Sequence, residues 1–261
     1  MIVRSAALLL LVMTFVSCSA AENDPSAKKG TAMKNESKET LVFEDGFDKE
    51  LENWKPEGPH LVEVKNGKLH VKTPGDSKNG QYIWCRTKLP ADFRLEWDVT
   101  PLSKSGFFLV FFCQEGVKGE DILGKDLFED YLHWKTWKPY QDFDKYVSSP
   151  KRKAYHQSRI RGYHVSYRRN ENANCNFRKN PGLRMVYSQT IDALLPKDHT
   201  AHVVLTKAGN RVKLVVDGKV FMDKPDTLGE AWSGGRFGFR NVYESEGTYD
   251  NVKLFDLTKR K

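Results

Sequence analysis

The stretch Arg159–Arg184 gathers side chains that can move a proton and side chains that can hold an anion. Its first half alternates as a β-strand does, so successive side chains would face opposite sides. One face would carry Tyr163, Val165 and Tyr167, and the other would carry His164, Ser166 and Arg168. An imidazole beside guanidinium groups suits the removal of a proton next to a negative group, because the cations stabilise the charge that develops.

We expect separate residues for proton transfer and for binding. His164 is the first candidate for the general base or acid, since it would lie on the polar face of the strand. His156 is the second, and Tyr167 would join them only if a bulge turned its phenol away from the apolar face. Arginine forks suit a carboxylate or a sulfate, and for each position the alternative is a packed or solvated side chain. The binding candidates are Arg168, Asn176, Arg178, Lys179, Arg240 and Gln114.

Two carboxylates offer a competing chemistry. Glu96 and Asp98 are two positions apart in an alternating segment, so they would share one face of a strand. Glycosidases use such carboxylate pairs, but the alternative is a solvated charged face. The Glu-x-Asp-x-Glu pattern is absent from the chain, which makes hydrolysis the weaker hypothesis.

Metal ligands are sparse, and the sequence implies no required cofactor. No spacing of histidine and aspartate suggests a catalytic ion. Glu44, Asp45 and Asp250 could form a structural calcium site of oxygen ligands. The alternative is that these acids form turns.

The cysteines do not form a disulfide framework. Apart from Cys18 there are three, an odd number, and none has CxxC spacing. Cys85 and Cys113 lie in apolar runs and are expected in the core. Cys175 lies among basic residues, so it is the one position where a reactive thiol is considered.

The net charge of +8 is concentrated in one region. Residues 134–184 contain 13 Lys and Arg against three acids, a local balance of +10. Such a focused charge indicates a polyanionic partner. Because the chain also carries an export leader, we expect an acidic polysaccharide rather than a nucleic acid.

The leader occupies residues 1–18. A short positive segment precedes an apolar run that is too short to span a membrane, and the run ends in a lipoprotein-type box whose Cys18 would be lipidated. A plain signal peptide cut near Ala20 is the alternative. Residues 19–40 read as a flexible linker and 41–261 as one domain. The protein would then be held by lipid at the outer membrane, on its periplasmic or its outer side.

Short strands separated by Gly, Asn and Asp turns fill the domain. Asn66-Gly67 and Asp217-Gly218 are typical of two-residue hairpins. The alternating segment 93–99 predicts a strand with one buried face, and the apolar run 106–114 predicts a strand buried on both faces. Residues 119–132 are the one plausible helix, and 134–161 form a long basic insertion. These elements predict an all-β jelly-roll sandwich.

The closing segments resemble the concanavalin-A-like lectin and glucanase superfamily. They are a Val-x-Val-Asp-Gly-x-Val-Phe hairpin, a Gly-x-Phe-Gly-Phe-Arg strand and an Asp-Asn-Val-x-Leu-Phe strand. That resemblance implies that the last strand pairs beside the first and that one sheet carries the ligand. Residues 93–101, 111–121, 155–156, 164–169, 175–179 and 238–240 are similar to the YesU-like family, whose genes lie among those for degrading uronic-acid-rich polysaccharides.

The expected function is β-elimination on a uronate. The C5 proton becomes acidic once the carboxylate charge is neutralised by Arg, Asn, Gln or His, after which a base removes it and the C4 oxygen departs. A glycosidic oxygen would make the enzyme a polysaccharide lyase, and a free hydroxyl would make it a dehydratase. A non-catalytic sugar-binding module is the main alternative.

Overall fold

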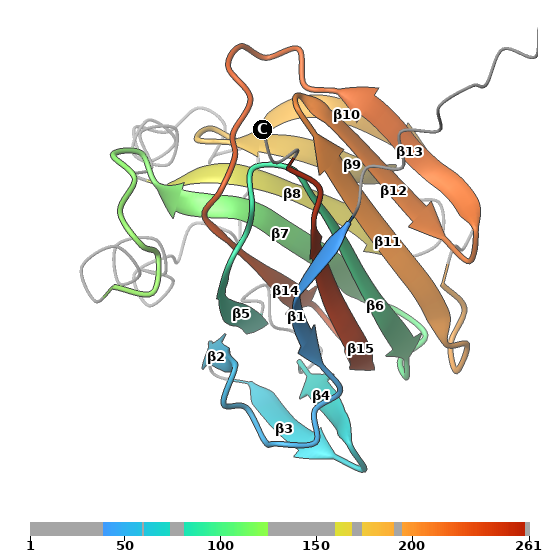
Figure 1. The fold of residues 1–261 in the computed structure, drawn as a ribbon. Helices are drawn as coiled ribbons and strands as arrows, with labels where there is room; N and C mark the ends of the chain where they lie inside the picture. Colours follow the sequence, from blue (N-terminus) through green and yellow to red (C-terminus); the bar gives the residue numbers. More distant parts are fainter. Residues whose placement is uncertain are drawn as a thin grey trace, which may run out of the picture. The chain divides into compact units, whose positions relative to one another are not determined.

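The computed structural model describes residues 39–58, 60–73, 81–124, 160–168, 174–190 and 195–258, without the side chains of Arg168 and Asn174. All of them belong to one compact unit, Ser37–Lys261. Within these ranges the chain forms fifteen β-strands and no helix (Figure 1). The strands are β1 Thr40–Asp45, β2 Trp54–Glu57, β3 Leu61–Lys65, β4 Lys68–Lys72, β5 Gln81–Lys88, β6 Phe93–Pro101, β7 Phe107–Gly116, β8 Ile160–Arg168, β9 Asn174–Asn180, β10 Arg184–Thr190, β11 Ala201–Ala208, β12 Arg211–Val216, β13 Lys219–Pro225, β14 Arg236–Val242 and β15 Glu246–Asp256.

Two antiparallel sheets form the predicted sandwich. Sheet A has the order β13-β12-β11-β6-β15-β4-β3, with β1 added beside β15. Sheet B has the order β10-β9-β8-β7-β14-β5-β2. The pairing of β1 with β15 confirms that the last strand lies beside the first. The fold class read from the sequence is therefore confirmed.

Local sequence explains the register of the hairpins. Asn66 and Gly67 both have positive φ, 54° and 69°, and join β3 to β4 in a two-residue turn. Asp217 and Gly218 do the same between β12 and β13, with φ of 48° and 74°. Such turns match the right-handed twist of paired strands. Both predicted hairpins are confirmed.

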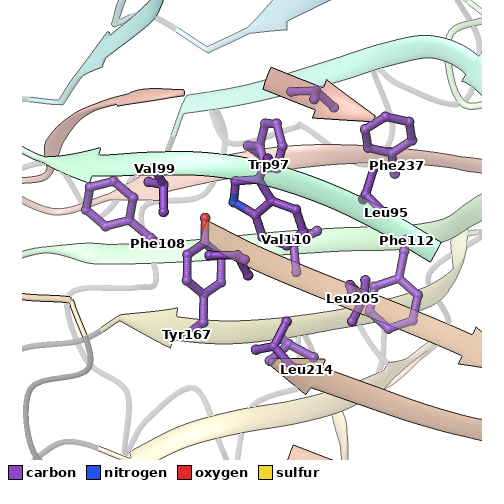
Figure 2. Close-up of a cluster of buried hydrophobic side chains, with 14 of the residues drawn as sticks. Leu95, Trp97, Val99, Phe108, Val110, Phe112, Tyr167, Leu205, Leu214 and Phe237 are labelled. Carbon is purple, nitrogen blue, oxygen red and sulfur yellow. The ribbon is translucent and has the colours of Figure 1, made fainter. Parts of the chain in front are cut away.

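The core lies between the two sheets. Strand β6 alternates strictly between buried and half-buried residues, as predicted, and turns its apolar side chains toward β7 and β8. The Trp97 indole meets the Tyr167 ring edge to face at a centroid distance of 5.6 Å. Figure 2 shows these two rings among the aliphatic side chains of both sheets.

A second apolar cluster lies on the other face of sheet B. It joins side chains of β5, β7, β8 and β14 to the turn after β7: Tyr82, Trp84, Leu109, Phe111, Ile122, Ile160 and Val242. Strand β7 is consequently buried on both faces, as the sequence predicted. Residues 119–124 form turns rather than the start of a helix, and the rest of that predicted helix lies outside the described residues.

Several predictions fall on parts of the chain that the structure does not describe. The leader with Cys18, most of the linker and most of the basic insertion with His156 are among them. They stay predictions. No helix within the described ranges is long and apolar enough to cross a membrane.

Candidate functional site

Two rows of cross-strand partners run over the outer face of sheet B, the face turned away from the core. Strand alternation and register place their side chains next to one another. The first row contains Arg178, His164, Phe111, Gly238 and Trp84. The second contains Ser166, Leu109, Arg240, Tyr82 and Glu57. The two rows bring together residues that are far apart in the sequence.

Gly238 leaves room for a neighbouring ring because it is the one residue of the first row without a side chain. A Cβ there would lie 2.6 Å from the Ile83 carbonyl oxygen and 2.6 Å from the Trp84 ring. The missing side chain thus lets the Trp84 indole lie against β14. Tyr82 stacks on Trp84 with centroids 5.4 Å apart. The closely packed rings of Tyr82 and Trp84 therefore form part of the surface of the site.

His164 lies on this outer face, as strand alternation predicted. The residue is 7% exposed, and its ring stacks on Phe111 with a centroid distance of 4.8 Å. Burial, followed by the charges of Arg178 and Arg240, lowers the pKa of His164 to about 3. The Nδ1 atom is buried and has no hydrogen-bond partner among the described residues. His164 is thus a neutral imidazole with an unused nitrogen beside two cations.

Backbone and aromatic contacts hold the two guanidinium groups near His164. Nη1 of Arg178 donates to the Leu183 carbonyl oxygen at 2.8 Å. The guanidinium carbon of Arg240 lies 4.6 Å from the centroid of the Tyr82 ring. Both groups belong to the predicted binding set, and the structure places both on the face of His164.

Asn176 shares this face on β9, at the edge of the second row. Its backbone N–H donates to the Ser166 hydroxyl at 2.9 Å, and its side-chain oxygen accepts from Ser188 at 2.7 Å. The hydroxyl of Ser188 thereby fixes the orientation of the amide. Asn176 is positioned to contribute at the rim of the site.

Tyr167 is corrected from a catalytic candidate to a core residue. Its side chain is fully buried between the sheets, on the side opposite His164. Burial raises its pKa above the ordinary value for a phenol. The pairing of β8 with β7 does shift register at this position, between the pairs Phe108–Arg168 and Leu109–Ser166, but the shift leaves the phenol on the inner face.

Lys179 is likewise corrected from a binding residue to a structural one. Its ammonium group forms a buried ion pair with Asp226 at 2.6 Å and donates to the carbonyl oxygens of Leu228 and Glu230. Phe177 precedes it on the same face of β9 and lies in the core. Strand alternation turns Lys179 inward, and Asp226 compensates its charge there.

Glu96 and Asp98 lie on the outer face of the other sheet. Glu96 forms an ion pair with Arg94. Asp98 accepts from Asn251 at 2.8 Å and pairs with His202 at 2.8 Å. The sandwich separates these carboxylates from the face of His164. Their ion pairs are those of a charged, solvated strand face, which was the alternative to a catalytic carboxylate pair.

The proposed calcium ligands have protein partners. Asp45 accepts hydrogen bonds from the Phe47 N–H and the Trp54 indole, at 2.7 and 2.9 Å. Glu44 pairs with Lys253 at 3.1 Å, and Asp250 lies 3.6 Å from Lys68. Among the described residues no group of three or more His, Cys, Asp or Glu side chains is placed to hold a metal ion. A calcium site here stays a prediction.

Among the described residues, Cys85, Cys113 and Cys175 are buried and form no disulfide bond. Burial raises the pKa of the Cys85 and Cys113 thiols to about 12. Both were expected in the core, and this is confirmed. Cys175 also lies in the core and is 5% exposed, so its basic sequence neighbours do not make it an accessible thiol.

Glu57 is a candidate that the sequence reading missed. It ends the short edge strand β2, in register with Tyr82. One oxygen pairs with Lys55 at 2.8 Å, and the other is buried without a hydrogen-bond partner among the described residues. Burial raises its pKa to about 7, although the Lys55 hydrogen bond opposes this. Pro56 is unusual in a strand, so the sequence reading did not predict one here. The signal that could have found it was Trp54: if its side chain faces the core, strand alternation places Glu57 on the outer face.

The raised pKa of Glu57 predicts a pH-dependent stability. Between the ordinary value of 4.5 and about 7, the folded chain keeps a proton that the unfolded chain has lost, so stability falls as the pH rises. Glu57→Gln removes this titration, so its free energy of unfolding should gain about 3 kcal/mol relative to the wild type between about pH 4 and about pH 8. Urea unfolding at both pH values measures the change. Glu52→Gln, at an exposed position, is the control, and equal pH dependence of Glu57→Gln and the wild type would contradict the prediction.

A family of known proteins matches most of the chain. Residues 41–254 match the model described as "Domain of unknown function (DUF1961)". The chain belongs to the DUF1961 family. This DUF1961 chain is 24% identical over 222 residues to the uncharacterized protein YesU of Bacillus subtilis (strain 168), covering 81% of this chain and 92% of that protein. The resemblance to the YesU-like family is confirmed.

Solved structures similar to this DUF1961 chain support the fold. A Bacillus subtilis protein of unknown function with a galectin-like fold superposes with a TM-score of 0.66 at 21% identity, covering 83% of this chain and 96% of that one. The carbohydrate-binding module CBM66 from Bacillus subtilis gives a TM-score of 0.51 at 16% identity, covering 78% and 96%. At such identities the similarity shows the fold alone.

Proposed function

We propose that this protein binds uronate-containing oligosaccharides, such as those from ulvan or rhamnogalacturonan, on the outer face of sheet B and catalyses β-elimination there. The observation that carries the proposal is the neutral imidazole of His164 beside the guanidinium groups of Arg178 and Arg240. We also propose that the lipidated chain acts at the outer membrane. The carbohydrate-binding module of the same fold supports a glycan ligand.

The reaction begins with charge neutralisation. Arg178 or Arg240 binds the uronate carboxylate, which acidifies the C5 proton of the sugar. The bound anion also offsets the cationic charge that lowers the pKa of His164, so the imidazole becomes a stronger base when substrate is present. His164 then takes the C5 proton, the C4–C5 double bond forms, and the C4–O bond breaks. His156 is the sequence's candidate for protonating the departing oxygen.

The test is the absorbance and mass of uronate oligosaccharides incubated with the protein. Rising ultraviolet absorbance with shorter fragments identifies a lyase. The same absorbance with loss of one water from an intact oligosaccharide identifies a dehydratase. Binding with a flat trace across a broad panel would overturn the elimination and leave a sugar-binding module, whereas new reducing ends without unsaturation would indicate hydrolysis.

A further inference from the structure

A bulge in β7 re-aims one side chain across β8. Phe112 pairs with Tyr163 and Glu115 pairs with Arg161, so Cys113 and Gln114 together stand opposite Gly162. Cys113 adopts a φ of 54° to make the bulge. A Cβ on Gly162 would lie 2.3 Å from Nε2 of Gln114, so the amide lies directly over this glycine. Bulges of this kind commonly direct side chains into sites.

The hydrogen bonds of Gln114 fix which way its amide points. Nε2 donates to the carbonyl oxygens of Phe112 and Tyr163, at 3.2 and 2.8 Å. Since both partners are acceptors, the nitrogen must face them. Oε1 is buried and has no hydrogen-bond partner among the described residues. With 1% of the residue exposed, this acceptor is held in place by the protein.

Asn180 supplies a donor on the opposite side of Gly162. It pairs with Gly162 across β8 and β9, and alternation puts its side chain on the outer face. Its Oδ1 accepts from the Leu183 N–H at 3.3 Å, which leaves Nδ2 as the outward group. That nitrogen is also buried without a partner in the described part of the chain, and the residue is 2% exposed.

The geometry points to a subsite for an unsulfated sugar hydroxyl, formed by Gln114 Oε1 and Asn180 Nδ2 and lying next to His164. This inference rests on the proposed function. It adds that the substrate has a free hydroxyl close to its carboxylate. Gln114, Asn180 and His164 are each more than nine-tenths buried, and each carries one polar atom without a hydrogen-bond partner among the described residues. Leaving such atoms unpaired is costly, so a ligand that pairs them is favoured.

The chemistry of the two amides selects among ligand groups. A hydroxyl can donate to Oε1 of Gln114 and accept from Nδ2 of Asn180 at the same time. A sulfate ester or a carboxylate only accepts, so it would leave Oε1 facing another oxygen. A site built to pair a hydroxyl strongly rejects an analogue that lacks it.

Calorimetry with defined disaccharides tests the subsite. The probes are a uronate-containing disaccharide with all hydroxyls free, its single-deoxy analogues and its single sulfate esters. At one hydroxyl, both deoxygenation and sulfation should weaken binding by about 10- to 100-fold. Asn180→Asp keeps the acceptor for Leu183 and removes the donor, so the parent should bind more weakly and the deoxy penalty should shrink. Asn210→Asp, at an exposed turn on sheet A, is the matched control.

The outcomes separate this subsite from the reaction. If the parent binds and is turned over but every deoxy and sulfated analogue binds as well as the parent, the subsite is wrong and the elimination stands. If the analogues discriminate but no double bond forms, the subsite stands and the elimination fails. If the parent does not bind, both fail. The analogue series uses the wild type, so it decides the question even if Asn180→Asp does not fold.

Discussion

Replacing His164 with alanine is expected to lower double-bond formation by about 10²- to 10⁴-fold, the usual contribution of a general base. Because Arg178 and Arg240 would still hold the carboxylate, binding of the oligosaccharide should change much less than turnover. The measurement is the initial rate of ultraviolet absorbance change beside a binding isotherm. Loss of binding with an unchanged rate at saturation would contradict a role for His164 as base.

The pH profile gives an independent readout of the same residue. A base acts in its neutral form, so kcat/KM should rise through the free-enzyme pKa of His164, at about 3. His164→Ala should lose that acidic limb. His202→Ala is the matched control, since His202 is an exposed histidine of sheet A that pairs with Asp98. It should retain both the rate and the profile.

Replacing Lys179 with methionine is expected to lower the free energy of unfolding by about 3 to 5 kcal/mol, the range for breaking one side of a buried ion pair. Burial disfavours the Asp226 carboxylate, but hydrogen bonds from Lys179 and Tyr163 nevertheless lower its pKa. Without the ammonium group the carboxylate would remain buried with too few donors. Urea unfolding at neutral pH measures the loss.

The exposed pair Arg211–Asp223 provides the control for this loss. Its atoms lie 2.6 Å apart, but more than half of the Arg211 side chain is exposed. Arg211→Ala should therefore cost about 0 to 1 kcal/mol. If Lys179→Met were no more destabilising than Arg211→Ala, Lys179 would not be the structural residue described above.

The sequence was sufficient for features that depend on alternation. Strand β6 shows the burial that its pattern predicted. Strand β8 turns Tyr163, Val165 and Tyr167 into the core as predicted, although its polar face is buried as well. The Asn-Gly and Asp-Gly turns lie between the strands they were expected to join. These features are local, so a few adjacent residues determine them. The same logic placed His164 on the outer face. Strand alternation in β9 would also have predicted that Lys179 faces the core, on the same side as Phe177.

The rest of the site depends on contacts between distant segments. The bulge that lays Gln114 over Gly162 results from β7 pairing with β8 and β14 at once, which no single segment encodes. The inward charge of Lys179 is tolerated only because Asp226, 47 positions later, lies beside it. Glu57 becomes unusual only through its burial beside Tyr82. Composition predicted which residue types form the candidate site, but the pairing of strands decided which residues lie together in it.

The positions of the last two strands also determine when the protein can fold. Strand β15 lies between β6 and β4 in sheet A, and β14 lies between β7 and β5 in sheet B (Figure 1). Neither sheet can be completed until the C-terminal residues have been synthesised, because each would otherwise be split in the middle. Pairings this distant in sequence make folding slow. The nascent chain would therefore leave the ribosome without its native sheets.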